Sequence, residues 1–443
     1  MPLLYSLCFI AIFQETVLGI VGLSGAALFF SRSVIDILSI VVFSYAVLRN
    51  TLERRPFQLS GTNYEKFFFA FFLYSIAISL VNWKSSLGIN IAEIVVLNRF
   101  VFLALSVPLL VSDERDIGKL LSFIWVMIFI QMGIGTVQAV GGSTVIDFFR
   151  PNDYSNIMAG TERSFTSNRG LDRNMLIGTL GDFISFAYVL AFGVILLLTK
   201  ASLRARDLIL LVLLLALIFL SGTRTVFLCA LFVAIVYLIY RIPRRWRLLA
   251  VTCCIIGGAS IIAVLLEIAA NMEYIGTSFW ALLRPELLSG LMNQRLGHLV
   301  LYLPLFITDP QAIIGLSPDR FYVANYVNQT YGFDLPYRFL YSFTDTLEDF
   351  YPSALISYYG LIGASLFYMA QFQLLKSALV SRSDSNETLA RISRMVLLLI
   401  IATNLLSLGN QSFENRGLSL MLWMTIGAYS SLLIFKRNGS VSN

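Results

Sequence analysis

A single arginine between two apolar runs is the first residue whose setting suggests chemistry. Arg224 stands in Leu220-Ser-Gly-Thr-Arg-Thr-Val-Phe227. An arginine cannot shed its charge, so in an apolar setting it needs an anionic partner. Its guanidinium offers a fork for phosphate oxygens, and the Ser-Gly-Thr turn opens the following helix at its N-terminus. This favours a phosphate ligand over the alternative, an arginine that anchors a helix end at the membrane surface.

Three further arginines gather upstream, before the sequence Gly178-Thr-Leu-Gly181. They are Arg163, Arg169 and Arg173. Asp172 and Asp182 are near them in the chain and could neutralise their charge. The group therefore predicts either more anion ligands or a solvated basic loop.

Two more groups follow in the C-terminal half. Arg295 and His298 are three residues apart, which places them on one face of a predicted helix. They precede Asp309-Pro310, Gly315 and Arg320-Phe321, and Arg320 is a possible accessory residue.

The last group is Asp345-Thr-Leu-Glu-Asp-Phe-Tyr351. Glu348 and Asp349 could cap the helix that follows. They could also supply a general base, because a sugar hydroxyl that attacks must lose its proton to a positioned carboxylate or imidazole. Both interpretations stay open.

Arg99 lies near the middle of an apolar run, where a charge usually marks function. Glu15 or Asp36 could pair with it structurally. The chain has one histidine, no His-Glu-x-x-His and no phosphate loop, and its four cysteines sit inside apolar runs. We therefore expect no metal and no cofactor, and neither an ATP-driven pump nor a zinc protease.

The elements that must position these residues are transmembrane helices. Of the 443 residues 57% are hydrophobic and 13% are charged, and the mean hydropathy is +0.78, values that exclude a water-soluble domain. Apolar runs recur along the whole chain at the length that crosses a bilayer. They predict one all-α integral membrane domain over 1–443, with about twelve spans at 3–30, 34–48, 66–82, 88–111, 117–141, 176–199, 208–221, 224–240, 248–268, 353–375, 395–409 and 417–435.

The lysines and arginines between these spans set the topology. They occupy every second connection, so the positive-inside rule places both termini in the cytoplasm and explains the net charge of +6 better than nucleic-acid binding does. Two outer connections, 142–175 and 269–352, are long and hold most of the candidate residues. Loops of this length are usually functional or disordered, and apolar periodicity over 291–307 predicts an ordered amphipathic helix in the second.

Three stretches resemble the O-antigen ligase and O-antigen polymerase superfamily of bacterial polysaccharide assembly. Ser221-Gly-Thr-Arg224 is similar to a Ser-x-Arg turn of that family. Arg295 to Phe321 resembles its Arg-…-Asp-Pro-…-Gly-…-Phe signature, and Leu347–Gly363 its His-Asn-…-Gly-Leu-Ile-Gly ending. Arg173–Ala187 is a weaker likeness. Asp349 stands where the ligases carry their histidine.

The resemblance implies a GT-C-like, metal-independent glycosyltransferase of the bacterial inner membrane that acts on the periplasmic face. Its donor would be an undecaprenyl pyrophosphate-linked oligosaccharide, with outer arginines holding the pyrophosphate and an acidic residue or histidine as base. The missing ligase histidine favours a polymerase, for which the resemblance implies a chain-length regulator protein as a candidate partner. The alternatives are a ligase that uses His298 as base and, from another class, a secondary transporter or lipid-linked glycan flippase.

Overall fold

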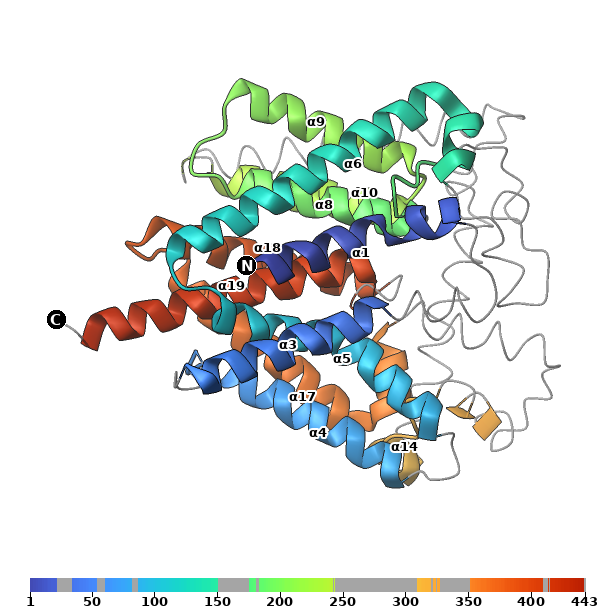
Figure 1. Ribbon diagram of the computed structural model, residues 1–443, viewed down its shortest axis with the longest axis vertical. Helices are drawn as coiled ribbons and strands as arrows, with labels where there is room; N and C mark the ends of the chain where they lie inside the picture. The colour runs from blue at the N-terminus through green and yellow to red at the C-terminus, as the bar shows by residue number, and fades with distance from the viewer. Residues whose placement is uncertain are drawn as a thin grey trace.

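The computed structural model describes the chain in ranges separated by gaps. These ranges are 1–21, 34–53, 60–81, 87–149, 175–180, 183–241, 243, 309–319, 322–323, 325–326, 351–408, 413 and 415–441. Within them every regular element is a helix, and none is a strand. The helices run back and forth across one bundle (Figure 1), so the protein is an α-helical, multi-pass membrane protein.

The described ranges contain eleven long helices and one short one. They are α1 (Pro2–Val21), α3 (Val34–Leu52), α4 (Asn63–Val81), α5 (Leu87–Leu110), α6 (Glu114–Phe149), α8 (Phe183–Leu198), α9 (Ala205–Leu220), α10 (Arg224–Arg241), α14 (Pro310–Ile314), α17 (Tyr351–Ser381), α18 (Glu387–Ser407) and α19 (Arg416–Val441). Eleven of the predicted spans overlap one of the long helices, and 248–268 lies outside the described residues. Seven helices in the described ranges are long and apolar enough to cross a membrane, so a total of twelve spans stays a prediction.

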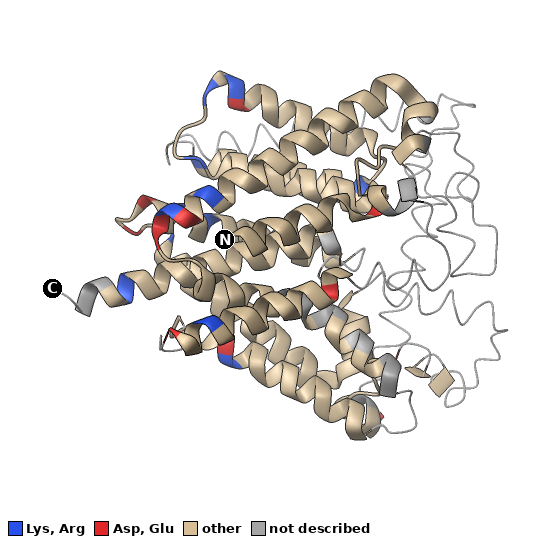
Figure 2. Cartoon of the chain, in the orientation of Figure 1, with Lys and Arg blue, Asp and Glu red and all other residues tan. Residues whose placement is uncertain are grey.

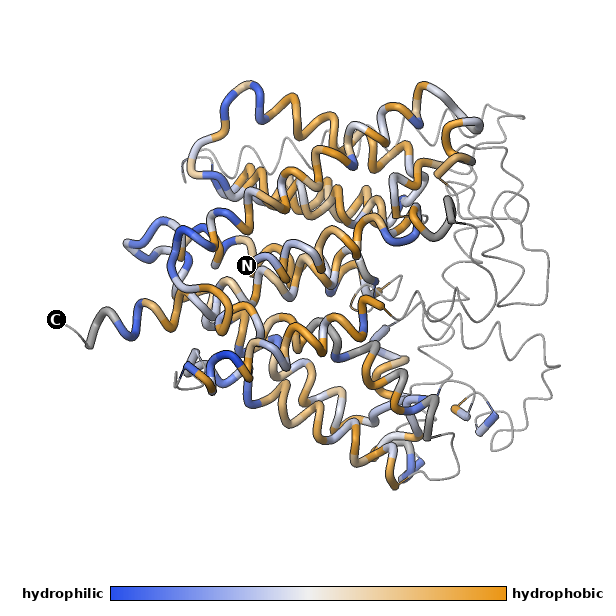
Figure 3. The backbone as a smooth tube through the Cα atoms, viewed as in Figure 1, coloured by the Kyte–Doolittle hydropathy of each residue, from blue (hydrophilic) through white to orange (hydrophobic). Residues whose placement is uncertain are grey.

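Two helices form the centre of the bundle because they are apolar on all sides. In α8 every residue from Phe186 to Leu198 is buried, and α19 is buried over most of its length. The peripheral helices instead expose large apolar side chains such as Ile209 and Val41. In Figure 3 the hydrophobic colour covers the middle of the bundle, as expected for a surface that faces lipid.

Charge divides the bundle into two ends. Both chain termini lie at one end, where Figure 2 shows most of the coloured Lys and Arg. Among the lysines and arginines whose side chains the structure describes, only Arg224 lies at the other end. We call these the basic end and the opposite end. This asymmetry is the one that the positive-inside rule uses, and it matches the alternation predicted from the sequence.

Several helices differ from their predicted bounds, and two of the differences lie at the opposite end. The span predicted at 117–141 is part of a helix that continues to Phe149 across a kink at Gly142 (φ 64°), so the helix covers the start of the predicted loop 142–175. The span predicted at 176–199 begins as a helix only at Phe183. A third deviation is the positive φ of Gly360, 66°, inside α17.

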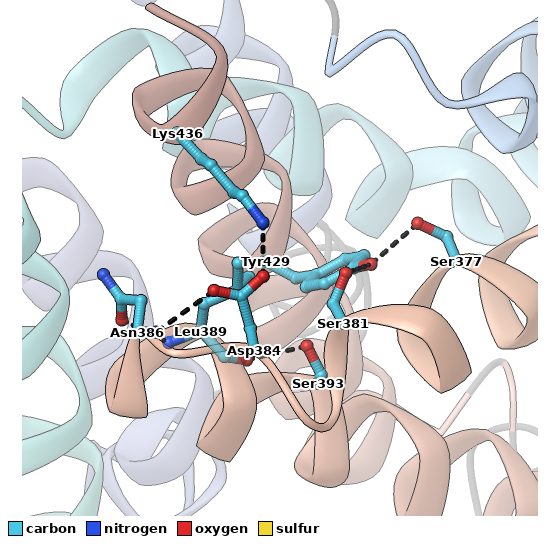
Figure 4. A network of polar contacts seen from close by, with 8 residues as sticks. All are labelled: Ser377, Ser381, Asp384, Asn386, Leu389, Ser393, Tyr429 and Lys436. Atoms are coloured by element: carbon cyan, nitrogen blue, oxygen red, sulfur yellow. Dashed lines mark hydrogen bonds and ion pairs between the residues drawn. The ribbon is translucent and has the colours of Figure 1, made fainter. Parts of the chain in front are cut away.

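The hairpin between α17 and α18 closes the basic end. Asp384 in the connection pairs with Lys436 of α19, and Asn386 caps α18 by accepting a hydrogen bond from the backbone N–H of Leu389 at 2.9 Å (Figure 4). The Tyr429 hydroxyl contacts Ser377 Oγ at 2.7 Å. These contacts fix the last helix of the chain to the α17–α18 hairpin.

Candidate functional site

Arg224 begins α10 at the opposite end of the bundle, directly after a tight turn from α9. The turn holds itself together: Ser221 Oγ donates to the carbonyl of Ile218 at 2.6 Å and lies 2.7 Å from Thr223 Oγ1. Gly222 takes a positive φ of 78°, which glycine adopts at no steric cost. The half-buried Arg224 is therefore carried at a helix N-terminus on a rigid turn, the setting expected for an anion ligand.

A second turn, residues 175–180, enters the bundle where the sequence predicted helix. Gln138 of α6 accepts hydrogen bonds from the backbone N–H groups of Ile177 (3.1 Å) and Gly178 (2.9 Å), and its amide donates to the Gly178 carbonyl at 3.0 Å. All of these groups are buried. Non-helical backbone is tolerated at membrane depth when protein surrounds it, which is the case here.

Thr179 ties the same turn to two further helices. Its N–H donates to Oε1 of Gln131 at 3.0 Å, and its hydroxyl donates to the carbonyl of Ile12 in α1 at 2.9 Å. Thr16 of α1 donates to the Thr179 carbonyl at 2.8 Å. The Gly178-Thr-Leu180 sequence is thus part of a fixed inner turn, and α8 starts after it.

The two turns touch each other. A methyl group added at Gly222 would lie 3.4 Å from the side chain of Met175. Met175 is two residues after Arg173 in the chain, and Gly222 is two residues before Arg224. The structure therefore brings the end of the upstream arginine segment to the Ser-Gly-Thr-Arg turn, although Arg173 itself lies outside the described residues.

A third segment, 309–319, packs on the outer part of α17. Asp309 caps α14 by accepting from the backbone N–H of Gln311 at 2.9 Å, and the Tyr326 hydroxyl donates to its other oxygen at 2.8 Å. The chain then passes Gly315 (φ 113°), which lies against Gly360. Leu316 N–H donates to the Ser357 carbonyl at 3.1 Å.

Two other helices hold this segment. The Tyr74 hydroxyl of α4 donates to the carbonyl of Ile314 at 2.5 Å. Ser317 Oγ donates to Asn90 Oδ1 of α5 at 2.8 Å, and both residues are buried. The Asp-Pro…Gly stretch is thus fixed to the bundle at the opposite end, the end that carries Arg224.

Most of the predicted site residues lie outside the described residues. This applies to Arg163, Arg169, Arg173, Arg295, His298, Arg320, Glu348 and Asp349, and also to the predicted helix 291–307. Arg99 is in α5, twelve residues after its first residue, and its side chain is likewise not described. Arg224 is the one predicted ligand whose surroundings can be examined.

The sequence reasoning missed the residues that hold the turns. Gln131, Gln138, Asn90 and Tyr74 were not singled out, although an amide inside an apolar run is a usable signal. Such a group must find a buried partner, because an unsatisfied polar group in hydrocarbon costs several kcal/mol. Among the described residues no group of three His, Cys, Asp or Glu side chains could hold a metal ion.

Comparison with known proteins adds no family assignment. No protein-family model matches the chain, and no curated protein matches it.

Proposed function

We propose that this chain is a membrane glycosyltransferase that polymerises a lipid-linked glycan. A hydroxyl of one lipid-linked repeat unit attacks the anomeric carbon of the growing chain. The bond between that carbon and the pyrophosphate oxygen breaks, the hydroxyl proton passes to a carboxylate, and undecaprenyl pyrophosphate leaves.

The position of Arg224 is the observation that supports the proposal most directly. This residue is the one described Lys or Arg side chain at the opposite end, it starts a helix, and its turn is rigid. A departing pyrophosphate gains negative charge, and fixed positive groups stabilise that charge at no cost in reorganisation. In this scheme Arg173 and Arg295 share the pyrophosphate with Arg224, while Arg163, Arg169 and Arg320 assist.

The two packed segments give the proposal its second support. The turn 175–180 contacts the Arg224 turn, and the segment 309–319 is fixed on α17 near its first turn. Asp349 is two residues before Tyr351, the first residue of α17. In the proposal Asp349 or Glu348 acts as the base, and the membrane around the site is the inner membrane of a bacterium.

The experiment compares Arg224→Ala, Arg224→Lys and the control Arg206→Ala, an exposed arginine at the basic end. Each full-length variant is reconstituted in proteoliposomes with undecaprenyl pyrophosphate-linked repeat units, and chain length is followed on a gel. We expect Arg224→Ala to lower the elongation rate about 10²-fold to 10³-fold, the usual effect of removing one stabilising donor. Arg224→Lys should recover part of it, and Arg206→Ala should match the wild type.

Undiminished chain length with Arg224→Ala would overturn the proposal. The same vesicles test the two alternatives. Transfer of finished glycan to a lipid A core without elongation would instead indicate a ligase. Movement of the lipid-linked glycan across the membrane without elongation would indicate a flippase.

A further inference from the structure

Helices α10 and α18 pack side by side at the basic end in a way that brings four arginines together. The helices run in opposite directions, and the thiol of Cys229 contacts the carbonyl of Ala402 at 3.6 Å. Eleven residues further toward the basic end, about three helical turns on each helix, are Tyr240 and Arg391. Three turns restore the same face, so Tyr240 and Arg391 lie at one level on the facing sides of the two helices.

Tyr237 and Arg394 are related in height, although not by helix face. Each is eight residues from the Cys229–Ala402 contact, again at one level. The guanidinium of Arg241 lies 5.3 Å from the Tyr237 ring centroid, and that of Arg382 lies 6.0 Å from the Tyr240 ring. The two ring centroids are 6.4 Å apart, and each ring has one arginine near it. We call Arg241, Arg382, Arg391 and Arg394 the arginine cluster.

Two members of the cluster have buried nitrogens without hydrogen bonds. Nε of Arg391 and Nε of Arg394 are both buried, and within the described part of the chain neither has a hydrogen-bond partner. Arg391 and Arg394 are three residues apart on α18, so their like charges lie on one side of the helix. A buried N–H group without a hydrogen-bond partner is costly, so these two partly buried arginines are suited to an anion that accepts from them.

Three aspartates at the basic end are already paired with lysines. Asp207 is paired with Lys200, Asp384 with Lys436, and Asp116 with Lys119. Glu387 precedes Arg391 by one turn, yet no ion pair joins the two among the described residues. The sequence after α10, from 242 to 266, contains no Asp or Glu and adds three arginines.

The surface beside the cluster is suited to lipid chains. On α10 the residues Leu228, Phe232 and Val236 are exposed, and this stripe ends at the half-exposed Tyr240. From Leu228 to Tyr240 the helix rises about 18 Å, close to the thickness of one leaflet of a ~30 Å hydrocarbon core. A ligand with acyl chains on the stripe would place its head group at the arginines.

We propose that the arginine cluster binds the phosphate group of an anionic phospholipid from the leaflet at the basic end. The guanidiniums of Arg391 and Arg394 donate to the phosphate oxygens, and Tyr240 marks the boundary between head group and acyl chains. Basic pockets between membrane helices recognise anionic head groups in this manner. The site is at the far end of the bundle from Arg224 and is independent of the glycan chemistry.

The test uses the full-length protein in nanodiscs. One set contains phosphatidylcholine alone and a second contains added phosphatidylglycerol, and native mass spectrometry counts the lipids that stay bound. The variants are Arg391→Gln with Arg394→Gln, Arg382→Gln alone, and the control Lys376→Gln, an exposed lysine of α17. A third arm adds inorganic phosphate to phosphatidylcholine discs and measures the thermal midpoint.

We expect phosphatidylglycerol to bind about tenfold more tightly than phosphatidylcholine, because each basic residue at the surface contributes to binding an anionic lipid. The double variant should lose this preference, Arg382→Gln should weaken it, and Lys376→Gln should keep it. Equal retention of both lipids by the wild type, or an unchanged preference in the double variant, would overturn the proposal. Stabilisation by inorganic phosphate equal to that by phosphatidylglycerol would also overturn it, in favour of a site for a free anion. If the double variant fails to fold, Arg382→Gln decides between these outcomes, because Arg382 is exposed.

Discussion

Gly315 and Gly360 lie back to back, each in a backbone conformation with positive φ. A Cβ atom at Gly315 would be 2.6 Å from the carbonyl carbon of Tyr359, and one at Gly360 would be 2.5 Å from the backbone nitrogen of Gly315. A Cβ atom essentially never lies this close to a backbone atom to which it is not bonded, so no side chain fits at either position unless the backbone shifts. The contact fixes segment 309–319 on the outer part of α17.

Alanine at Gly360 is therefore expected to destabilise the protein. The substitution adds a steric clash to a positive φ, and strain of this kind costs about 1–3 kcal/mol before the clash is counted. The thermal midpoint of purified Gly360→Ala should fall, and elongation activity should fall with it because segment 309–319 shifts. Gly315→Ala should behave in the same way.

Gly133→Ala is the matched control for both. Gly133 lies within α6 at a helical position, and an added Cβ would meet nothing within 4 Å. Alanine there should leave the midpoint unchanged or raise it, since glycine in a helix is less favourable than alanine by about 0.5–1 kcal/mol. Equal midpoints for Gly360→Ala and Gly133→Ala would contradict the proposed contact.

Much of the bundle could be predicted from sequence because apolar runs of sufficient length report directly on spans. The start of α8 could not. The run 176–199 is mostly apolar, but its first residues form a turn because their backbone N–H groups donate hydrogen bonds to Gln131 and Gln138, about 40 residues earlier. The contact between Gly315 and Gly360 could not be predicted from the sequence either, because nothing in the sequence indicates that two distant glycines pack against each other. The place of Arg224 at a turn between two helices could be predicted, since an isolated charge between apolar runs is easily recognised, and its role as a phosphate ligand stays a prediction.

Gln138→Met should unfold the turn 175–180 while leaving α6 helical. Methionine preserves the length of the side chain but removes one donor and an acceptor shared by two buried N–H groups, those of Ile177 and Gly178. Each buried group left unpaired costs about 1–3 kcal/mol. We expect a lower thermal midpoint, together with faster proteolysis after the turn.

Gln373→Leu provides the comparison for Gln138→Met. Gln373 is a partly exposed residue of α17 whose amide has only a 4.0 Å contact to a methionine sulfur. Its loss should change the free energy of unfolding by less than about 0.5 kcal/mol, as for most surface substitutions, and should therefore shift the thermal midpoint only slightly. A larger effect for Gln373→Leu than for Gln138→Met would argue against the turn as a fixed element.

The pairing of Asp384 with Lys436 predicts a stability that depends on pH. The hydrogen bond from Lys436 holds the pKa of Asp384 below its usual value, which is about 3.9 for an unperturbed Asp. A carboxyl with a lowered folded-state pKa contributes stability above the unfolded-state pKa and loses it as the pH falls through the folded-state value. The wild type should therefore exceed Lys436→Met in thermal midpoint at pH 7, and the difference should shrink below about pH 4. Because the Lys436 side chain is 59% exposed, the difference at pH 7 should correspond to about 0.2–1 kcal/mol and should fall in high salt.

Lys66→Met removes an exposed lysine of α4 and should show no such pH dependence. A difference between wild type and Lys436→Met that persists unchanged at pH 3 would mean that the lysine acts through packing of its aliphatic stem against α19 and the α17–α18 connection, and not through the Asp384 charge.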